Sequence, residues 1–253
     1  MGKNKLKKFA EMETFTHVFQ LSYNELMQGA AFELRGHWCD TFFRNTNPIV
    51  LELGCGRGEY TVELARRFPD KNFIGIDIKG ARMWTGAKQV QELGLTNAAF
   101  VRTGINAIPH FFAPGEVAEI WITFPDPQMK KQGKRLVCTD FLKLYEQIMP
   151  TEGIINLKTD SNFLFTYAKA VVECNHLPLL AATDNIEATH PDDPLLNIRT
   201  YYETQWRARG INIKYLRFGI AHQNEWHEPD IDIPYDEYRS YGRQKRSSLT
   251  AGK

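Results

Sequence analysis

The sequence lacks an apolar run of the roughly 18 residues that a membrane-spanning helix needs, and its charged start has no hydrophobic signal core. Cysteine is scarce, and neither a C-x-x-C pair nor a regular spacing relates the four residues, Cys39, Cys55, Cys138 and Cys174. His222 and His227 are five positions apart, which does not align two ligands on one helix face. These absences argue against a disulfide framework and against a metal site. We therefore expect a cytoplasmic protein with no membrane partner and no bound metal.

The chain also lacks a net charge that would indicate a polyanionic partner, since 31 Lys and Arg against 30 Asp and Glu leave a formal charge of +1. The charges are nevertheless unevenly distributed. Residues 1–8 carry four lysines and residues 239–253 carry five cations, in both cases without an acid, whereas residues 225–237 carry six carboxylates and no Lys or Arg. Blocks of like charge are usually solvated tails. The alternative for the two basic ends is contact with phosphate.

No internal repeat or linker divides the chain, and apolar runs alternate with segments of helical spacing from residue 49 onward. The apolar runs predict strands over residues 49–53, 72–78, 98–102, 118–124, 153–159, 177–182 and 211–219. Helical spacing predicts helices over residues 60–68, 81–94, 140–149, 161–175 and 199–210, with a short helix or turn over 105–112. This alternation is typical of a mostly parallel sheet with helices on both faces. We expect a seven-stranded α/β domain over residues 48–220, preceded by a basic arm with helical segments (1–47) and followed by an acidic, then basic tail (221–253).

Three glycines follow the first predicted strand in the segment LELGCGRG, at Gly54, Gly56 and Gly58. Glycine lets the backbone turn sharply and approach a ligand without a Cβ in the way. The spacing differs from the dinucleotide motif G-x-G-x-x-G, and the segment lacks the lysine and hydroxyl of a P-loop. Glu52 before the loop suits an ammonium group, and Asp77 at the end of the second predicted strand suits ribose hydroxyls. A ligand with ribose and adenine but no phosphate therefore fits better than a dinucleotide, and turn glycines beside surface acids are the alternative.

The stretch WITFPDPQMKKQGKRL (residues 121–136) places Asp126 between Pro125 and Pro127, just after the fourth predicted strand. Proline fixes its own φ and restricts the residue before it, so Asp126 is held in one backbone conformation. Ligands of parallel α/β sheets bind at the carboxyl ends of the strands, near the point where the strand order reverses. A rigid acid there suits the recognition of a base. The cations that follow would lie along a phosphate backbone, or alternatively only solubilise a surface turn: Lys130, Lys131, Lys134 and Arg135.

The order of LELGCGRG, GIDI and WITFPDP resembles that of the class I S-adenosylmethionine-dependent methyltransferases, which have a Rossmann-like fold. More narrowly, FPDPQMKK (124–131), LKTD (157–160) and TYYE (200–203) are similar to segments of the bacterial tRNA (guanine-N7)-methyltransferases, and the likeness spans about residues 48–219. The resemblance implies methyl transfer from S-adenosylmethionine to N7 of guanine 46 in the variable loop of tRNA. That family commonly has Trp and Pro where this chain has Gln128 and Met129, and its basic loop is longer and contains a histidine.

The resemblance also implies roles for individual residues. It implies a catalytic role for Asp126, and cofactor contacts from the glycine loop together with Glu52, Asp77, Asn106 and Asp126. It implies substrate contacts from Lys130, Asp160, Thr200, Tyr202 and Glu203. Helix capping is the alternative role for Asn106 and Asp160, and exposed helix positions are the alternative for Thr200 and Glu203.

The implied chemistry makes modest demands on the protein. N7 of guanine carries a lone pair and no proton, so methyl transfer depends on an in-line approach and needs no general base. A carboxylate beside the purine would stabilise its positive charge and accept hydrogen bonds from N1–H and the exocyclic amine, and Asp126 and Asp160 are the candidates. Two other functions stay open, a class I methyltransferase acting on a small molecule or protein, and a non-catalytic tRNA-binding subunit. We expect a monomer or a homodimer.

Overall fold

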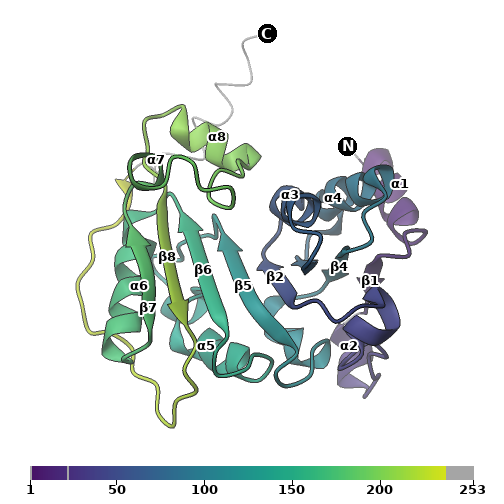
Figure 1. Cartoon of the computed structure of the whole chain (residues 1–253), viewed down its shortest axis with the longest axis horizontal. Coiled ribbons are helices and arrows are strands. Elements are labelled where there is room, and N and C mark those ends of the chain that lie inside the picture. Colours follow the sequence, from purple (N-terminus) through teal and green to yellow (C-terminus); the bar gives the residue numbers. More distant parts are fainter. Residues whose placement is uncertain (1, 22, 238–253) are drawn as a thin grey trace.

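The mostly parallel sheet predicted from the alternating apolar runs is present (Figure 1). Within the described residues it has eight strands and not seven. The computed structural model describes residues 2–21 and 23–237. The strands are β1 (Val18–Gln20), β2 (Ile49–Leu53), β3 (Asn72–Ile76), β4 (Ala98–Arg102), β5 (Val117–Thr123), β6 (Ile154–Thr159), β7 (Leu179–Thr183) and β8 (Lys214–Gly219). The seven strands predicted from the sequence are all confirmed, with ends that differ by up to three residues.

The helices lie close to the predicted segments from residue 59 onward, with one short addition, α7. In the described part of the chain they are α1 (Gly2–Met12), α2 (Tyr23–Met27), α3 (Glu59–Arg67), α4 (Gly80–Leu93), α5 (Thr139–Glu146), α6 (Asn162–Cys174), α7 (Ile186–Thr189) and α8 (Tyr201–Arg207). A π-helix, η1 (Trp38–Phe43), and two short 3₁₀ helices, η2 (Ile105–His110) and η3 (Gln132–Lys134), complete the set. None of the described helices has the length and apolar character to cross a membrane.

The eighth strand, β1, lies in the segment that was predicted to be only a basic, helical arm. It pairs in parallel with β4, and Val18 lies opposite Phe100 in the register. Phe19 packs edge-on against the rings of Trp38 and Phe42, with centroid separations of 5.0 and 5.2 Å. A strand of three residues is too short to show a period of its own, so its pairing depends on the sheet edge that the rest of the chain provides.

The strand order is β1-β4-β3-β2-β5-β6-β8-β7, and every neighbouring pair is parallel except the two that involve β8, which runs antiparallel to β6 and to β7. The chain moves outward from β2 to β3 and β4, and then returns to place β5 on the other side of β2. The order therefore reverses between β2 and β5, where Leu53 pairs with Ile122. The loops that leave these two strands start side by side, and they are the glycine loop and the Pro-Asp-Pro loop.

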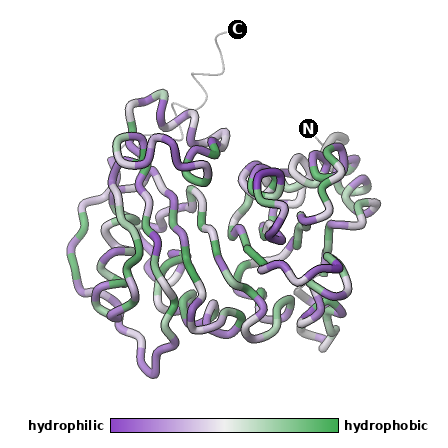
Figure 2. Tube along the Cα trace, in the orientation of Figure 1, coloured by the Kyte–Doolittle hydropathy of each residue, from purple (hydrophilic) through white to green (hydrophobic). Residues whose placement is uncertain are grey.

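Alternate residues of the central strands face two separate apolar layers, as the period of a strand requires. Leu51 and Leu53 of β2 pack with residues of η1, α5 and α6 on one face. Val50 packs with residues of α3 and α4 on the other face, where α1 lies against α4. Figure 2 shows apolar residues along the strands. The prediction of helices on both faces is confirmed.

The acidic segment of residues 225–237 is fastened to the protein at two of its six acids, Glu228 and Asp236, whereas the other four are exposed, as its charge pattern suggested. Glu228 accepts hydrogen bonds from the backbone N–H and the hydroxyl of Thr139, at 2.8 and 2.7 Å. Asp236 is buried and accepts hydrogen bonds from the Ser161 hydroxyl and from the Phe163 N–H. Both acids lie at helix N-termini, of α5 and α6, where unpaired N–H groups favour a carboxylate. The basic residues from Arg239 onward lie outside the described part of the chain.

Candidate active site

The glycine loop lies at the carboxyl end of β2, and its backbone needs glycine. The φ angles of Gly54, Gly56 and Gly58 are 76°, 57° and 72°, in the left-handed region that other residues rarely adopt. A Cβ at Gly54 would meet nothing within 4 Å, and one at Gly56 would meet only the Gly54 carbonyl oxygen at 3.9 Å. A Cβ at Gly58 would instead lie 2.7 Å from the Phe100 ring. The first two glycines leave the loop surface bare, and the third lets α3 pack on the sheet.

Asp77 follows β3 and supports this loop with its half-buried carboxylate. One carboxylate oxygen accepts the Gly56 N–H at 2.9 Å, and the other accepts the Lys79 N–H at 2.7 Å. A carboxylate offers about four acceptor positions, so each oxygen keeps capacity for a further donor. Asp77 therefore lies where an acid for ribose hydroxyls was predicted, beside the exposed backbone of the glycine loop.

Glu52 is a buried acid at the junction of β2, α3 and β5. Its Oε2 accepts the Thr61 N–H at 2.9 Å and the Thr61 hydroxyl at 2.5 Å, and its Oε1 accepts the Thr123 hydroxyl at 2.7 Å. Burial raises the pKa of Glu52 to about 7, because desolvation of the charged form outweighs these hydrogen bonds. The group is therefore poised between its neutral and charged forms, and a cation brought beside it would favour the carboxylate.

The Pro-Asp-Pro loop leaves β5 with a strained backbone. Phe124 and Gln128 have φ angles of 49° and 46°, which are uncommon for residues other than glycine. Asp126 between them is exposed, and its Oδ1 accepts the Gln128 N–H at 3.1 Å. The Phe124 N–H donates to the Lys158 carbonyl at 2.8 Å, which fastens the start of the loop to β6. Strain of this kind collects at functional sites, and it presents the Asp126 carboxylate at the surface.

The basic loop after Asp126 does not have four available cations. Arg135 is 8% exposed, and its guanidinium lies 4.7 Å from the ring centre of Phe163 and 4.3 Å from that of Tyr167. It also donates to the Met129 carbonyl at 3.0 Å. The expectation that Arg135 lies along a phosphate backbone is wrong, because its charge is used inside the protein to support the loop. The three exposed cations are Lys130, Lys131 and Lys134.

Asn106 and Asp160 occupy different surroundings, and neither is the N-cap residue of its helix. Asn106 is exposed in η2, whose N-cap is Gly104, and it lines a surface hollow of about 660 Å³. Asp160 is fully buried after β6, and its backbone carbonyl accepts the Lys214 ammonium at 3.0 Å. The N-cap of α6 is Ser161, whose hydroxyl accepts the Leu164 N–H at 2.9 Å.

The TYYE segment begins α8 and is more buried than an exposed helix would be. Thr200 caps the helix, since its hydroxyl oxygen accepts the Glu203 N–H at 3.2 Å. Thr200 is 7% exposed and Glu203 is fully buried, so the alternative that both are exposed helix positions is wrong. Tyr202 is half-buried, and the ring of Tyr201 lies 4.5 Å from the Arg57 guanidinium of the glycine loop. The segment therefore reaches the beginning of α3.

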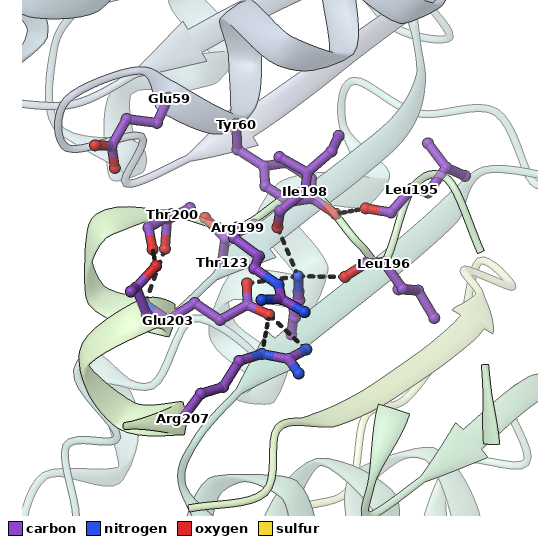
Figure 3. A network of polar contacts seen from close by, with 12 residues as sticks. Glu59, Tyr60, Thr123, Leu195, Leu196, Ile198, Arg199, Thr200, Glu203 and Arg207 are labelled. Carbon is purple, nitrogen blue, oxygen red and sulfur yellow. Dashed lines mark hydrogen bonds and ion pairs between the residues drawn. The ribbon is translucent and has the colours of Figure 1, made fainter. Parts of the chain in front are cut away.

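Lys158 of the LKTD segment is a residue whose importance the sequence reasoning missed. It is fully buried, and its ammonium donates to the carbonyls of Leu196 and Ile198 and to Glu203 Oε2, at 2.7, 2.9 and 2.7 Å. Figure 3 shows this network, in which Arg207 approaches the Glu203 carboxylate. Burial lowers the pKa of Lys158 to about 8, against the opposing effect of Glu203. A lysine inside an apolar strand was the available signal, because a buried cation needs partners.

The described residues contain no group of three or more His, Cys, Asp and Glu side chains that is arranged to hold a metal ion. The four cysteines are free. The groups that the site presents at the ends of β2, β3 and β5 are carboxylates, the bare glycine backbone and exposed lysines.

Comparison with known proteins shows relatives over the full length of the chain. It is 54% identical over 253 residues to a tRNA (guanine-N(7)-)-methyltransferase of Bacteroides fragilis, which covers 100% of both chains. It is 59% identical over 239 residues to the enzyme of the same name from Porphyromonas gingivalis, which covers 93% of this chain and 98% of the relative. A family model described as "Putative methyltransferase" matches residues 46–216.

Solved structures with the same fold are more distant in sequence. The 16S rRNA methyltransferase KamB superposes with a TM-score of 0.55 at 14% identity, over 80% of this chain and 95% of that one. An antibiotic-related methyltransferase superposes with a TM-score of 0.53 at 17% identity, over 78% of this chain and 93% of that one. At these identities the comparison shows a shared fold, which is the class I methyltransferase fold.

Proposed function

Because the chain belongs to the tRNA (guanine-N(7)-)-methyltransferase family, whose members use S-adenosylmethionine, we propose that it methylates N7 of guanine 46 in the variable loop of tRNA. The observation that carries this proposal is the pairing of β2 with β5 where the strand order reverses. This pairing brings the bare glycine loop next to the loop that presents Asp126. A cofactor on the first loop and a base against the second would then be neighbours.

The residues of the glycine loop fit S-adenosylmethionine, which has a ribose, an adenine and a cationic amino-acid end but no phosphate. The open space above Gly54 and Gly56 admits a ligand against the backbone. We assign the ribose hydroxyls to Asp77 and the ammonium end to Glu52, whose pKa of about 7 allows a cation to shift it to the carboxylate. Asn106, beyond the neighbouring strand β4, is the candidate for the adenine. When bound, the cofactor supplies a methyl group on a sulfonium, which is an electrophile.

Asp126 is the acid that we propose to contact the guanine. It is exposed, whereas Asp160 is fully buried, so of the two candidate acids Asp126 is the one that a base reaches without rearrangement of the protein. Its carboxylate would accept hydrogen bonds from N1–H and the exocyclic amine of guanine. It would also stabilise the positive charge that the purine gains as N7 is alkylated. No proton leaves N7, so this acid acts as a carboxylate throughout.

The exposed lysines of the adjoining loop are the proposed phosphate contacts. Lys130, Lys131 and Lys134 follow Asp126 by a few residues and carry charge at the surface. Each neutralised phosphate releases condensed counterions, which makes binding depend on salt concentration. The base itself must leave its stack to reach Asp126, at a cost of a few kcal/mol. We propose that the segment of Thr200–Glu203, with the half-buried Tyr202, borders the same entrance.

The test is methyl transfer to tRNA that differs at one base. The purified protein is incubated with methyl-labelled S-adenosylmethionine and unmodified tRNA, beside the same tRNA with guanine 46 replaced by adenine. We expect label only in the first tRNA, recovered as N7-methylguanosine after digestion. Label in both tRNAs would contradict position 46, and label in neither, with measurable cofactor binding, would favour a methyltransferase of another substrate. The Asp126→Ala variant is the matched control for chemistry at this site.

A further inference from the structure

The ammonium of Lys158 holds one segment of the chain against the sheet. Two of its acceptors are the carbonyls of Leu196 and Ile198, and the third is the carboxylate of Glu203 (Figure 3). All three acceptors belong to residues 195–203, here called the strap, which comprises the end of the connection between α7 and α8 and the first turn of α8. A buried ammonium has three donors, and here the strap satisfies all of them. The strap is therefore held at one point by a cation that solvent does not reach.

The strap is also tied to α3, the helix that the glycine loop begins. The Tyr60 hydroxyl donates to the Leu195 carbonyl at 2.7 Å, and the Tyr201 N–H donates to Glu59 Oε2 at 3.0 Å. The donor, Tyr60, and the acceptor, Glu59, both lie in the first turn of α3, directly after Gly58. In Figure 3, Glu59 and Tyr60 face the strap residues from the opposite side of the network. The strap thus spans from β6 to the start of α3.

A third connection joins Lys158 to the loop that presents Asp126. The Lys158 carbonyl accepts the Phe124 N–H at 2.8 Å, and the Lys158 ammonium lies 5.9 Å from the centre of the Phe124 ring. Phe124 is the strained residue from which the Pro-Asp-Pro loop starts. One lysine therefore touches the origin of the Asp126 loop with its backbone and the strap with its side chain.

We propose that Lys158 is a positioning residue. It fixes the position of the strap relative to the Asp126 loop, so that the guanine that accepts the methyl group is held in place for the transfer. This inference rests on the proposed function and deepens it. It also changes the reading of Glu203, whose carboxylate is fully buried, with Oε2 on Lys158 and Oε1 on Arg207. Glu203 acts through Lys158, and not by touching the tRNA.

The alternative is that the pair only contributes to folding stability. A buried ion pair is a poor device for that purpose, since apolar residues of similar volume are often as stabilising. A charge with three fixed acceptors defines one position of the strap, because each hydrogen bond is directional. An apolar contact would define that position less specifically. The two readings differ in what the variants do to tRNA kinetics.

The test is a double-mutant cycle on Lys158→Met and Glu203→Gln. Each single variant should lower kcat/KM for tRNA at least tenfold, with the cofactor Kd within twofold of the wild type. If Glu203 acts through Lys158, kcat/KM of the double variant should be within about twofold of that of the less active single variant. Losses that multiply in the double variant, or a Lys158→Met enzyme with more than half of the wild-type kcat/KM, would overturn the inference. Lys71→Met is the matched control, because it breaks a Lys–Glu pair of 3.1 Å with Glu119 near the amino ends of the strands.

A milder variant keeps the test decisive should Lys158→Met fail to fold. Tyr60→Phe removes only the hydroxyl that binds the Leu195 carbonyl, and it should lower kcat/KM for tRNA several-fold in the same direction. Tyr215→Phe is its control, since that hydroxyl binds Asn156 inside the sheet at 2.7 Å. Normal kinetics of Tyr60→Phe would count against the strap.

Hydrogen–deuterium exchange without tRNA separates this inference from the proposed function. Amides of residues 195–207 should exchange at least tenfold faster in Glu203→Gln and in Lys158→Met, while those of β4 keep their wild-type rates. Unchanged exchange in the strap would overturn the inference whatever substrate the wild type accepts. Failure of the wild type to methylate tRNA would instead overturn the proposed function.

Discussion

The buried acid Glu52 gives a quantitative prediction about stability and pH. Its pKa rises on folding from an ordinary value of 4.5 to about 7, because burial disfavours the charged form. Between these two values the native protein holds a proton that the unfolded chain releases, so stability falls as pH rises. Each tenfold change in proton affinity corresponds to about 1.4 kcal/mol. The free energy of unfolding therefore falls by about 3 kcal/mol between pH 4.5 and 8 through Glu52 alone. This fall is complete only above the pKa of Glu52 in the folded protein.

The perturbation is Glu52→Gln, which keeps the shape of the side chain but cannot ionise. We expect the free energy of unfolding of the variant, relative to wild type, to rise by about 3 kcal/mol from pH 4.5 to pH 8. Urea unfolding at several pH values, followed by tryptophan fluorescence, measures it. Glu152→Gln is the control, since that carboxylate is exposed in the turn before β6. A difference between wild type and Glu52→Gln that stays constant with pH would refute the argument from desolvation.

The remaining predictions concern the loop after β5 and the proposed cofactor end. Asp126→Ala should lower kcat for tRNA at least 100-fold with unchanged circular dichroism, and near-normal turnover would remove Asp126 from the mechanism. Lys130→Ala should raise the KM for tRNA and reduce the slope of log KM against log salt by about one, with cofactor affinity unchanged. Arg135→Ala should lower the free energy of unfolding by about 2 kcal/mol and leave that salt slope unchanged, because its guanidinium is buried on two aromatic rings. Calorimetry should show that Glu52→Gln weakens S-adenosylmethionine binding about tenfold at pH 8 and less at pH 5.5, where wild-type Glu52 is mostly protonated.

Local features of the sequence were sufficient for seven of the eight described strands, for most of the helices from residue 59 onward, and for the position of the glycine loop. Short apolar runs and helical spacing depend on a period that is visible within ten residues, so the sheet and the helices from residue 59 onward were predicted. The glycine loop was readable for the same reason, because positive φ angles at Gly54, Gly56 and Gly58 demand glycine wherever they occur. Asp77 could be placed beside this loop because it lies at the end of a predicted strand.

Other features were decided by residues that are far apart in the chain. Arg135 reads as one cation in a basic run, yet it is buried on rings of α6. The charge pattern of residues 225–237 suggests solvation, yet Asp236 binds at the start of α6. Lys158 finds its three acceptors some forty positions later. The sequence by itself determined which segments form strands, helices and the glycine loop, since those depend on neighbouring residues. Only the tertiary structure decided which charges are buried and what they hold, because the partners of a buried charge meet through packing and not through spacing.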